Sequence, residues 1–389
     1  MTRRHAPADP IAREDSTAMH APATAVTEIP YALRRIGLLM SPEPGDDREA
    51  EGVINPASGR DASGTVHLYP RMVATGNFSR IGDARVVVED GVPSGVERLG
   101  IALQPDRIWE RGSGHGGTED PRITWIAELG LHVMTYVAFG PTGPRPAIAV
   151  SADLGSWRRL GPIQFEYEDA LGADLNVYPN KDVVFFPEPV PGPDGAPSFA
   201  ALHRPMWDLS FVRPDDSAPV PASVDDARPS IWISYVPVED VVADAARLVR
   251  LGGHRMVAGP EFDWESLKIG AGPAPLRVPE GWLLLHHGVS GRVEGSAFVP
   301  QRHVRYCVGA MILDPLDPSR VLARSPHPIL EPETADETDG VVANVVFPTA
   351  IEEIEGVRYV FYGMADYRIG VAALERTAPA IDGEATWSR

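Results

Sequence analysis

A short polar stretch, Glu119-Asp120-Pro121-Arg122, stands directly before an apolar run that extends to Phe139. Two adjacent carboxylates and an arginine can supply a proton and bind an anion, so this stretch could carry acid and anion-binding chemistry. We expect Asp120 to be the acid. Because an isolated Glu-Asp pair is usually a solvated turn, this expectation depends on which other groups the fold brings to the same place.

Other polar residues also lie where apolar runs begin or end, which is where loops on a rigid β scaffold carry binding and catalytic groups. Lys181 and Arg204 each adjoin an apolar run, and charges close to a core need partners. His286 and His287 are adjacent, so only one of them can face a given side of a strand. The polar candidates at such positions are Asn55, Arg71, Lys181, His203, Arg204, Lys268, His287 and Asp366.

The overall charge argues against several classes of partner. The chain has 54 acidic and 35 basic residues and a formal net charge of -19. It lacks the basic surplus that phosphate backbones and anionic membranes require, so we expect neither nucleic acid nor membrane as a partner. The acidity is typical of a well-solvated surface.

The cysteine content, the spacing of metal-ligating residue types and the hydropathy bear on which cofactors the protein could bind and in which compartment we expect it. Cys307 is the single cysteine, so the chain cannot form an internal disulfide. No residues have the spacing of a zinc or calcium loop, and we expect neither a metal nor an organic cofactor. No run approaches the roughly 20 apolar residues of a membrane span. The segment after Arg3-Arg4 lacks the apolar region of a signal peptide, so we expect a cytoplasmic protein.

The elements that must position these groups are predominantly short β-strands. Gly, Pro, Asn and Asp separate the apolar runs, and residues 123–129 and 131–139 form a predicted hairpin with Gly130 at its turn. One helix is predicted over residues 238–251, ended by Gly252-Gly253. Further predicted strands cover residues 66–69, 84–89, 147–151, 183–186, 199–202, 231–236, 282–287, 304–313, 342–347, 357–362 and 369–374.

Strands that are not separated by helices disfavour a parallel α/β sheet and favour a sandwich, barrel or propeller. The length of 389 residues favours the propeller. We expect residues 1–30 to be a flexible tail, residues 31–376 to be a single catalytic domain, and residues 377–389 to be a second tail. Residues 213–229 are expected to form a surface loop.

Taken together, the motifs resemble glycoside hydrolase family 130, the mannoside phosphorylases and their relatives. Their order along the chain is that of the family, and the resemblance covers residues 36–374. The matching stretches are Glu-Asp-Pro-Arg-Ile at 119–123, Leu-His-Arg-Pro-Met at 202–206, Lys-Ile-Gly-Ala-Gly-Pro at 268–273, Trp-Leu-Leu-Leu-His-His-Gly-Val at 282–289, Asn-Val-Val-Phe-Pro at 344–348, and Phe-Tyr-Gly-Met-Ala-Asp at 361–366.

The resemblance implies an all-β fold, a five-bladed β-propeller with a funnel-shaped active site at its centre. It also implies that inorganic phosphate attacks a β-mannoside with inversion and releases α-mannose 1-phosphate. The family's acid maps onto Asp120 and is thought to act through the 3-hydroxyl of the mannose. An inverting glycosidase needs a second carboxylate to activate water, whereas a phosphorylase needs cations that hold phosphate.

The residues divide between these tasks. Lys181, Arg204 and His287 are our candidates for binding phosphate, and His203 is the next. Asn55, Arg71, Glu119, Lys268 and Asp366 are candidates for binding the sugar. Tyr136, Trp207 and Tyr306 could stack on sugar faces, although a packing role is more common for each.

Two alternatives stay open. The family also contains β-mannosidases that hydrolyse the bond, and these generally lack the basic cluster and use glutamates to activate water. A non-catalytic carbohydrate-binding propeller is the alternative from another class, and the combination of Asp120 with the cations argues against it. The sequence leaves open whether the linkage is β-1,2 or β-1,4 and which sugar is the acceptor. It also leaves open whether the chain forms a homo-oligomer, as family members often do.

Overall fold

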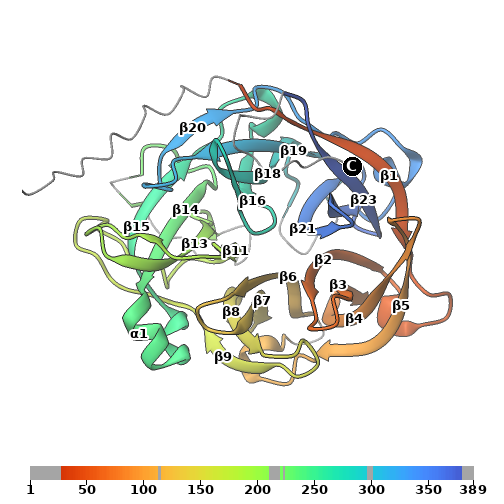
Figure 1. The fold of residues 1–389 in the computed structure, drawn as a ribbon, viewed down its shortest axis with the longest axis horizontal. Helices are drawn as coiled ribbons and strands as arrows, with labels where there is room; N and C mark the ends of the chain where they lie inside the picture. The colour runs from red at the N-terminus through yellow and green to blue at the C-terminus, as the bar shows by residue number, and fades with distance from the viewer. Residues whose placement is uncertain (1–27, 113–114, 210–219, 222–223, 296–300, 379–389) are drawn as a thin grey trace, which may run out of the picture.

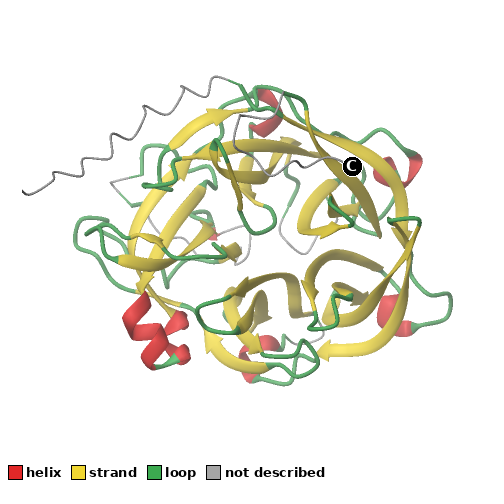
Figure 2. Ribbon diagram, viewed as in Figure 1, coloured by secondary structure: helices red, strands yellow, loops and turns green. Residues whose placement is uncertain are grey.

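The computed structural model describes residues 28–112, 115–209, 220–221, 224–295 and 301–378. Regular structure in these residues is almost entirely β-strand, as Figure 2 shows, which confirms the expected all-β class. The first strand begins at Tyr31 and the last ends at Arg376. Most residues of the two expected tails, and residues 213–219, 222 and 223 of the expected surface loop, lie outside the described residues.

The strands form largely antiparallel sheets that surround a common centre, with β10 (Gln164–Phe165) and β15 (Arg250–Ala258) pairing in parallel (Figure 1). One sheet has the order β1-β23-β22-β21 and therefore joins the first described strand to the last. Its strands are β1 (Tyr31–Met40), β21 (Val346–Ile354), β22 (Val357–Met364) and β23 (Arg368–Arg376).

A larger sheet consists of two antiparallel halves. They meet at one short parallel pairing, in which Phe78 lies opposite Gly116 and Ser79 opposite Gly117. The first half contains β2 (Gly52–Arg60), β3 (Val66–Ala74), β4 (Phe78–Glu89) and β5 (Val92–Leu103). The second contains β6 (Gly116–Ile126), β7 (Leu131–Gly140), β8 (Gly143–Ser151) and β9 (Arg158–Pro162).

The two remaining sheets complete the arrangement. One has the order β10-β15-β14-β13-β11 with β12 beside β13, and the other has the order β16-β18-β19-β20 with β17 beside β18. The strands of the first are β10 (Gln164–Phe165), β11 (Asn180–Phe185), β12 (Val190–Pro191), β13 (Pro197–Pro205), β14 (Ile231–Pro237) and β15 (Arg250–Ala258). The strands of the second are β16 (Lys268–Ala271), β17 (Leu276–Val278), β18 (Gly281–Arg292), β19 (His303–Leu313) and β20 (Val321–Arg324).

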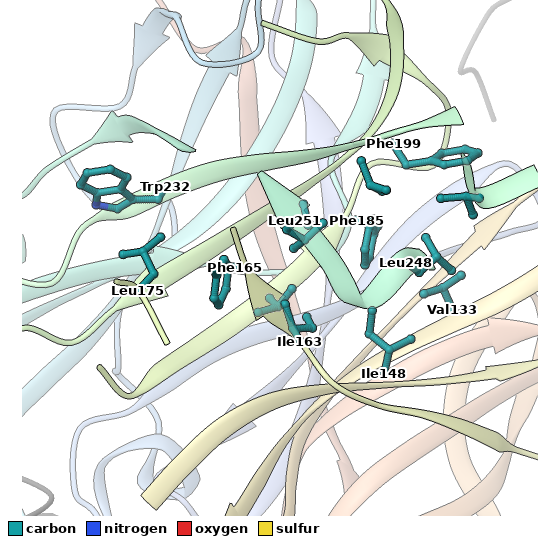
Figure 3. Packing of buried hydrophobic residues seen from close by; sticks show 14 of the residues in the cluster. Val133, Ile148, Ile163, Phe165, Leu175, Phe185, Phe199, Trp232, Leu248 and Leu251 are labelled. Atoms are coloured by element: carbon teal, nitrogen blue, oxygen red, sulfur yellow. The ribbon is translucent and has the colours of Figure 1, made fainter. Parts of the chain in front are cut away.

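The hydrophobic core lies between neighbouring sheets. Val133 and Ile148, from β7 and β8, pack in one buried cluster with Phe185, Phe199 and Trp232 from the next sheet (Figure 3). Similar clusters lie at the other sheet contacts. Burial of this apolar surface supplies the main driving force for folding and fixes how the sheets face one another.

The predicted hairpin is confirmed, because β6 and β7 pair in antiparallel fashion and Gly130 adopts a φ of 60° at the turn. The predicted helix was too long. Helix α1 covers only Val238–Ala243, because Asp244 has an extended backbone and caps the following 3-10 helix, Ala245–Val249. Residues from 250 onward belong to β15, which pairs with β14. The strand predicted to begin at residue 342 begins at Val346.

A buried glutamate in a short helix recurs four times within the part of the chain that the structure describes and was not recognised in the sequence. Each glutamate is fully buried and accepts a backbone N–H from residues just before it. Each also pairs with an arginine from an outer strand. The pairs are Glu49–Arg98, Glu110–Arg159, Glu265–Arg324 and Glu337–Arg35, and the helices are Asp47–Glu49, Ile108–Glu110, Asp263–Glu265 and α2 (Ala335–Thr338).

This buried glutamate–arginine pair fastens a connecting segment to the outer edge of its sheet. In three of the four cases a side chain from the sheet adds a further hydrogen bond to the carboxylate: the Tyr136 hydroxyl at 2.7 Å, His286 Nε2 at 2.8 Å and the Tyr362 hydroxyl at 2.9 Å. A buried carboxylate is tolerated only when it is paired and its oxygens are hydrogen-bonded. Each pair therefore stabilises the closure of one sheet against the next.

We predict that Glu265→Gln lowers the free energy of unfolding by about 3–5 kcal/mol, because it removes the buried counter-charge of Arg324 and leaves only the exposed Glu261 beside it. The matched control is Glu375→Gln, which breaks the Arg34–Glu375 pair, whose side chains are 59% and 47% exposed. That change should cost less than about 1 kcal/mol. Urea unfolding of both variants checks the prediction, and equal losses would contradict it.

Candidate active site

Three of the strands nearest the centre carry the same irregularity. The pairing register of β2, β6 and β11 breaks at Asn55, Asp120 and Asp182, and these residues adopt left-handed φ values of 45°, 45° and 57°. Asn and Asp tolerate this conformation better than other residues with side chains. A β-bulge of this kind re-aims a side chain out of the regular alternation. The same device therefore presents one polar side chain from each of three strands.

The bulges in β2 and β6 bring Asn55 and Asp120 into direct contact. Asn55 Nδ2 donates a hydrogen bond to Asp120 Oδ1 at 2.8 Å, and Arg71 NH1 donates to the same oxygen at 3.1 Å. Gly363 leaves the space for Asn55, because a Cβ there would lie 2.2 Å from Asn55 Oδ1. The Asp120 side chain is 10% exposed.

The charges around Asp120 favour its ionised form. Burial by itself would raise the pKa of Asp120, but attraction by Arg71 and Lys181, together with the hydrogen bond from Asn55, outweighs burial and lowers the pKa to about 2. Without a ligand, Asp120 is therefore a carboxylate at neutral pH. It can deliver a proton only if a bound group changes this balance.

Glu119 holds two cations beside Asp120. It accepts from Arg71 NH2 at 3.0 Å and from Lys181 Nζ at 3.2 Å, and it is buried. Arg71 is fixed further by Ser79 Oγ at 2.8 Å and Asn77 Oδ1 at 2.8 Å. Both oxygens of Glu119 are thus occupied, which suits a residue that orders its cationic neighbours.

Arg122 supports the turn that contains Asp120. Its NH1 donates to the backbone oxygens of Asp120 at 3.1 Å and Pro121 at 3.3 Å, and its Nε donates to Gly272 O at 3.0 Å. The side chain is fully buried, and NH2 has no hydrogen-bond partner. Arg122 therefore rigidifies the bulge and leaves one buried N–H group unsatisfied.

Asp182 is the centre of a second, deeply buried group of charges. Its Oδ2 accepts from Arg204 Nε at 2.5 Å and lies 3.6 Å from His287 Nε2. Its Oδ1 lies 3.9 Å from Arg122 NH2. Burial would raise the pKa of Asp182, but Arg204, His287 and Arg122 lower it well below its usual value. Gly270 makes room, since a Cβ there would lie 2.3 Å from Asp182 Oδ2.

Several donors in this group have no acceptor. Arg204 NH1 and both ring nitrogens of His287 are buried without a hydrogen-bond partner, as is Arg122 NH2. Burial holds the pKa of His287 well below its usual value, so the ring is neutral and offers one N–H. Unsatisfied buried donors are costly, and several of them in one place indicate that an anionic or polar ligand completes the site.

Lys268, Tyr306 and Asp366 form a third part of the same neighbourhood. Lys268 Nζ lies 5.3 Å from the centre of the Tyr306 ring. Burial, with repulsion from Arg204, lowers the pKa of Lys268 to about 7. Burial, with repulsion from Asp120, raises the pKa of Asp366 to about 6 despite attraction from Arg71. Both groups therefore change charge close to physiological pH.

The structure brings together nearly all the residues singled out in the sequence. Asn55, Arg71, Glu119, Asp120 and Lys181 form one bonded set. Arg204 and His287 meet at Asp182, and Lys268 and Asp366 are coupled electrostatically to both sets.

His203 lies apart from these groups. Its Nδ1 pairs with Asn180 and its Nε2 with Ser234, so neither nitrogen is left for phosphate. The expectation that His203 binds phosphate is therefore corrected. Adjacent residues of a strand face opposite sides of the sheet, and because Arg204 faces the centre, His203 faces away from it.

Asp182 was not recognised as a site residue in the sequence. A signal was present, because an aspartate inside the apolar run at 180–186 needs a partner when buried. Of the aromatic candidates, Tyr136 and Trp207 are buried packing residues, and Tyr306 alone is part of the site.

Within the described residues, no group of three His, Cys, Asp or Glu side chains could hold a metal ion. The described residues also contain no helix long and apolar enough to cross a membrane.

Comparison with known proteins identifies relatives over most of the chain. The model of glycoside hydrolase family 130, described as β-1,4-mannooligosaccharide phosphorylase, matches residues 48–378. A 1,2-β-oligomannan phosphorylase of Thermoanaerobacter sp. (strain X514) is 29% identical over 351 residues, which cover 87% of this chain and 94% of the relative. A β-1,2-mannobiose phosphorylase of the same organism is 32% identical over 263 residues, 67% of each chain.

A solved structure has the same fold. The β-1,2-mannobiose phosphorylase of Listeria innocua, in complex with β-1,2-mannobiose, aligns with a TM-score of 0.63 at 22% identity, covering 89% of this chain and 97% of that one.

We predict that Asp366→Asn stabilises the protein and that the gain is larger at pH 7.5 than at pH 4.5. The raised pKa means that the folded state keeps a proton which the unfolded state releases above its ordinary pKa of 3.8. The Asp366 carboxyl of the wild type therefore lowers the free energy of unfolding by a growing amount as the pH rises toward 6, and by its full amount above pH 6. Thermal unfolding at both pH values measures the gain, and a gain independent of pH would show that Asp366 is ionised throughout.

Proposed function

The chain belongs to glycoside hydrolase family 130, and we propose that it catalyses the inverting phosphorolysis of a β-mannoside to give α-mannose 1-phosphate. The observation that carries this proposal is the set of buried, unsatisfied donors on Arg204, His287 and Arg122 beside Asp120. Such a set suits an oxyanion with several acceptor oxygens, and phosphate is one. A water nucleophile would need a carboxylate base, and both oxygens of nearby Glu119 are already engaged.

The roles of the residues follow from charge and geometry. Arg204, His287 and Lys181 bind phosphate, Asn55, Arg71, Lys268 and Asp366 bind mannose hydroxyls, and Glu119 orders Arg71 and Lys181. Asp120 is the acid and passes a proton to the glycosidic oxygen through the mannose 3-hydroxyl. Holding both reactants in a fixed orientation converts the attack into an effectively unimolecular step.

The low pKa of free Asp120 fits this mechanism if phosphate binds first. A phosphate anion close to Lys181 and Arg122 opposes the attraction that those cations exert on Asp120, so it raises the pKa of Asp120. The proton inventory also balances. When an oxygen of hydrogenphosphate bonds to C1, the glycosidic bond breaks and Asp120 supplies the proton that the leaving oxygen takes up. The proton lost by hydrogenphosphate then restores Asp120.

We further propose that the sheets are the five blades of a β-propeller. The supporting observation is that the eight-stranded sheet divides into two antiparallel halves at one short parallel contact, so that each of five units places one strand, β2, β6, β11, β16 or β21, nearest the centre. The β1–β23 pairing then closes the ring.

A phosphate-dependence assay tests the reaction. With β-1,2- or β-1,4-mannobiose and inorganic phosphate, we expect one α-mannose 1-phosphate and one mannose per disaccharide, measured by ³¹P NMR and sugar analysis. Omission of phosphate should abolish turnover, because both oxygens of Glu119 are engaged and the donors of Arg204 and His287 suit an anion as the nucleophile. Two mannose molecules per disaccharide without phosphate would assign the chain to the hydrolases, and no turnover of any mannoside would favour a binding role.

We predict that Asp120→Asn lowers kcat by about 10²–10⁴-fold, because positioned acid catalysis contributes that much. Asn tolerates the left-handed backbone, so folding should be preserved. The matched control is Asp90→Asn, at an exposed aspartate with a similar φ of 50°, which should keep full activity. Activity of Asp120→Asn within a few-fold of the wild type would show that Asp120 is not the acid.

A further inference from the structure

We propose that a buried hydrogen-bonded chain, Asn180–His203–Ser234–His254, is a positioning relay that fixes Arg204 for phosphate. The proposal rests on the phosphorolytic function above and adds residues to it that do not touch the reacting groups. The relay runs from the start of β11 through β13 and β14 to β15. It is buried along its length, with His203 1%, Ser234 0% and His254 9% exposed.

The contacts are continuous and short. Asn180 Nδ2 lies 3.0 Å from His203 Nδ1, and His203 Nε2 lies 2.7 Å from Ser234 Oγ. Ser234 Oγ lies 2.8 Å from His254 Nδ1, and His254 Nε2 lies 2.8 Å from the backbone oxygen of Glu166. Phe165 packs against both rings, with ring centres 4.7 Å from His203 and 5.7 Å from His254.

The two ends of the relay fix the direction of every hydrogen bond in it. The Glu166 carbonyl can only accept, so His254 carries a proton on Nε2, which also lies 3.7 Å from Glu168 Oε1. At the other end the Arg204 backbone N–H can only donate to Asn180 Oδ1, and the relay between these ends requires Ser234 to donate its hydroxyl proton to His254 Nδ1. Ser234 Oγ then accepts from His203 Nε2, which leaves His203 Nδ1 as an acceptor. Asn180 must therefore present its NH₂ group to His203. Burial lowers the pKa of His203 well below its usual value, so this ring is neutral and carries its single proton on Nε2.

The direction of these hydrogen bonds determines which side of the Asn180 amide faces Arg204. With its NH₂ group committed to His203, Asn180 must turn its oxygen the other way, and Oδ1 accepts the backbone N–H of Arg204 at 3.1 Å. Had the amide been reversed, two donors would face each other at Arg204. The relay thus selects the one amide orientation that holds the Arg204 backbone.

Arg204 needs this support because the regular ladder fails around it. The Asp182 bulge breaks the register between β11 and β13 directly after the Lys181–Arg204 pair. On the other side of that pair, Asn180 lies opposite Pro205, which has no backbone N–H. The Arg204 guanidinium is held by Asp182 and its backbone by Asn180. Losing the second support leaves the phosphate-binding arginine free to shift, and a small misplacement of a binding group is costly.

Ser234→Ala tests the relay, because it removes the central link and little volume. We expect the KM for phosphate to rise about tenfold, as for loss of one hydrogen-bonded support, while kcat at saturating phosphate stays within about threefold. Ser234→Thr keeps the hydroxyl and should restore the KM. The matched control is Ser198→Ala, another buried serine, on β13 of the same sheet, which should leave the KM unchanged. An unchanged KM in Ser234→Ala would overturn the proposal.

Histidine tautomers give a readout that a purely structural role would not move. In ¹⁵N NMR spectra of the wild type at pH 7, His203 and His254 should both be neutral with the proton on Nε2. A proton on Nδ1 of either ring would overturn the proposed direction. Asn180→Asp keeps the oxygen facing Arg204 but removes the donor to His203, so His203 should gain a proton on Nδ1. An unaltered His203 spectrum in this variant would also overturn the proposal.

The relay can be tested independently of the proposed reaction. Binding of inorganic phosphate to the intact protein, measured by calorimetry without any sugar, reports on the relay whether or not turnover occurs. We expect the Kd for phosphate to follow the same order, with Ser234→Ala weaker than wild type and Ser234→Thr close to it. If the wild type binds phosphate but shows no phosphorolysis, the proposed function fails while the relay is still tested.

Discussion

Buried positive charge is the constraint on which the centre of this protein depends. Arg71, Arg122 and Arg204 are buried close together, with the partly exposed Lys181 beside them, in a molecule whose interior is otherwise largely apolar, and uncompensated charges in such surroundings are very costly. Glu119 and Asp182 supply the compensation. Each carboxylate engages at least two cationic or polar side chains, and together they hold several positive groups at fixed separations. The remaining donors without acceptors are the part of this balance that a ligand would complete.

Buried carboxylates pair with arginines both at the centre of the molecule and at its edge, but the two sets differ in how fully their polar groups are hydrogen-bonded. Around the rim, the glutamates of the short helices are fully satisfied by one arginine, by backbone N–H groups and, in three cases, by a side chain of the sheet. At the centre, Arg204 and His287 keep groups without partners. Fully satisfied buried networks rigidify a fold, whereas partly satisfied ones mark places where stability is given up for binding. The outer pairs therefore support the frame within which the central charges can remain unbalanced.

Much of this arrangement could be predicted from the sequence, and the exceptions have physical causes. The Gly130 hairpin and the class of fold followed from local patterns, since turn residues and apolar runs act over a few positions. The grouping of Asp120 with Lys181 and Arg204 came from matching motifs, because contacts across such sequence distances are not encoded in local periodicity. Helix α1 was overestimated because pairing with β14 outweighs the helical pattern after Asp244. His203 was misplaced because strand alternation, which decides the side it faces, was applied to other residues and not to it.

The pairing of β1 with β23 has a consequence for how the chain reaches its native state. Tyr31 lies opposite Arg376, so the earliest described strand acquires its partner only after residues 368–376 have been synthesised. Until then β1 has an unpaired edge, and the apolar residues that it contributes to the cluster with Val346 and Val360 lack their cover. A nascent chain must therefore keep this edge from associating with other chains while the intervening sheets form. Because the two ends of the folded region are adjacent, they could also be joined and the chain opened at another turn, with the central charges still brought together.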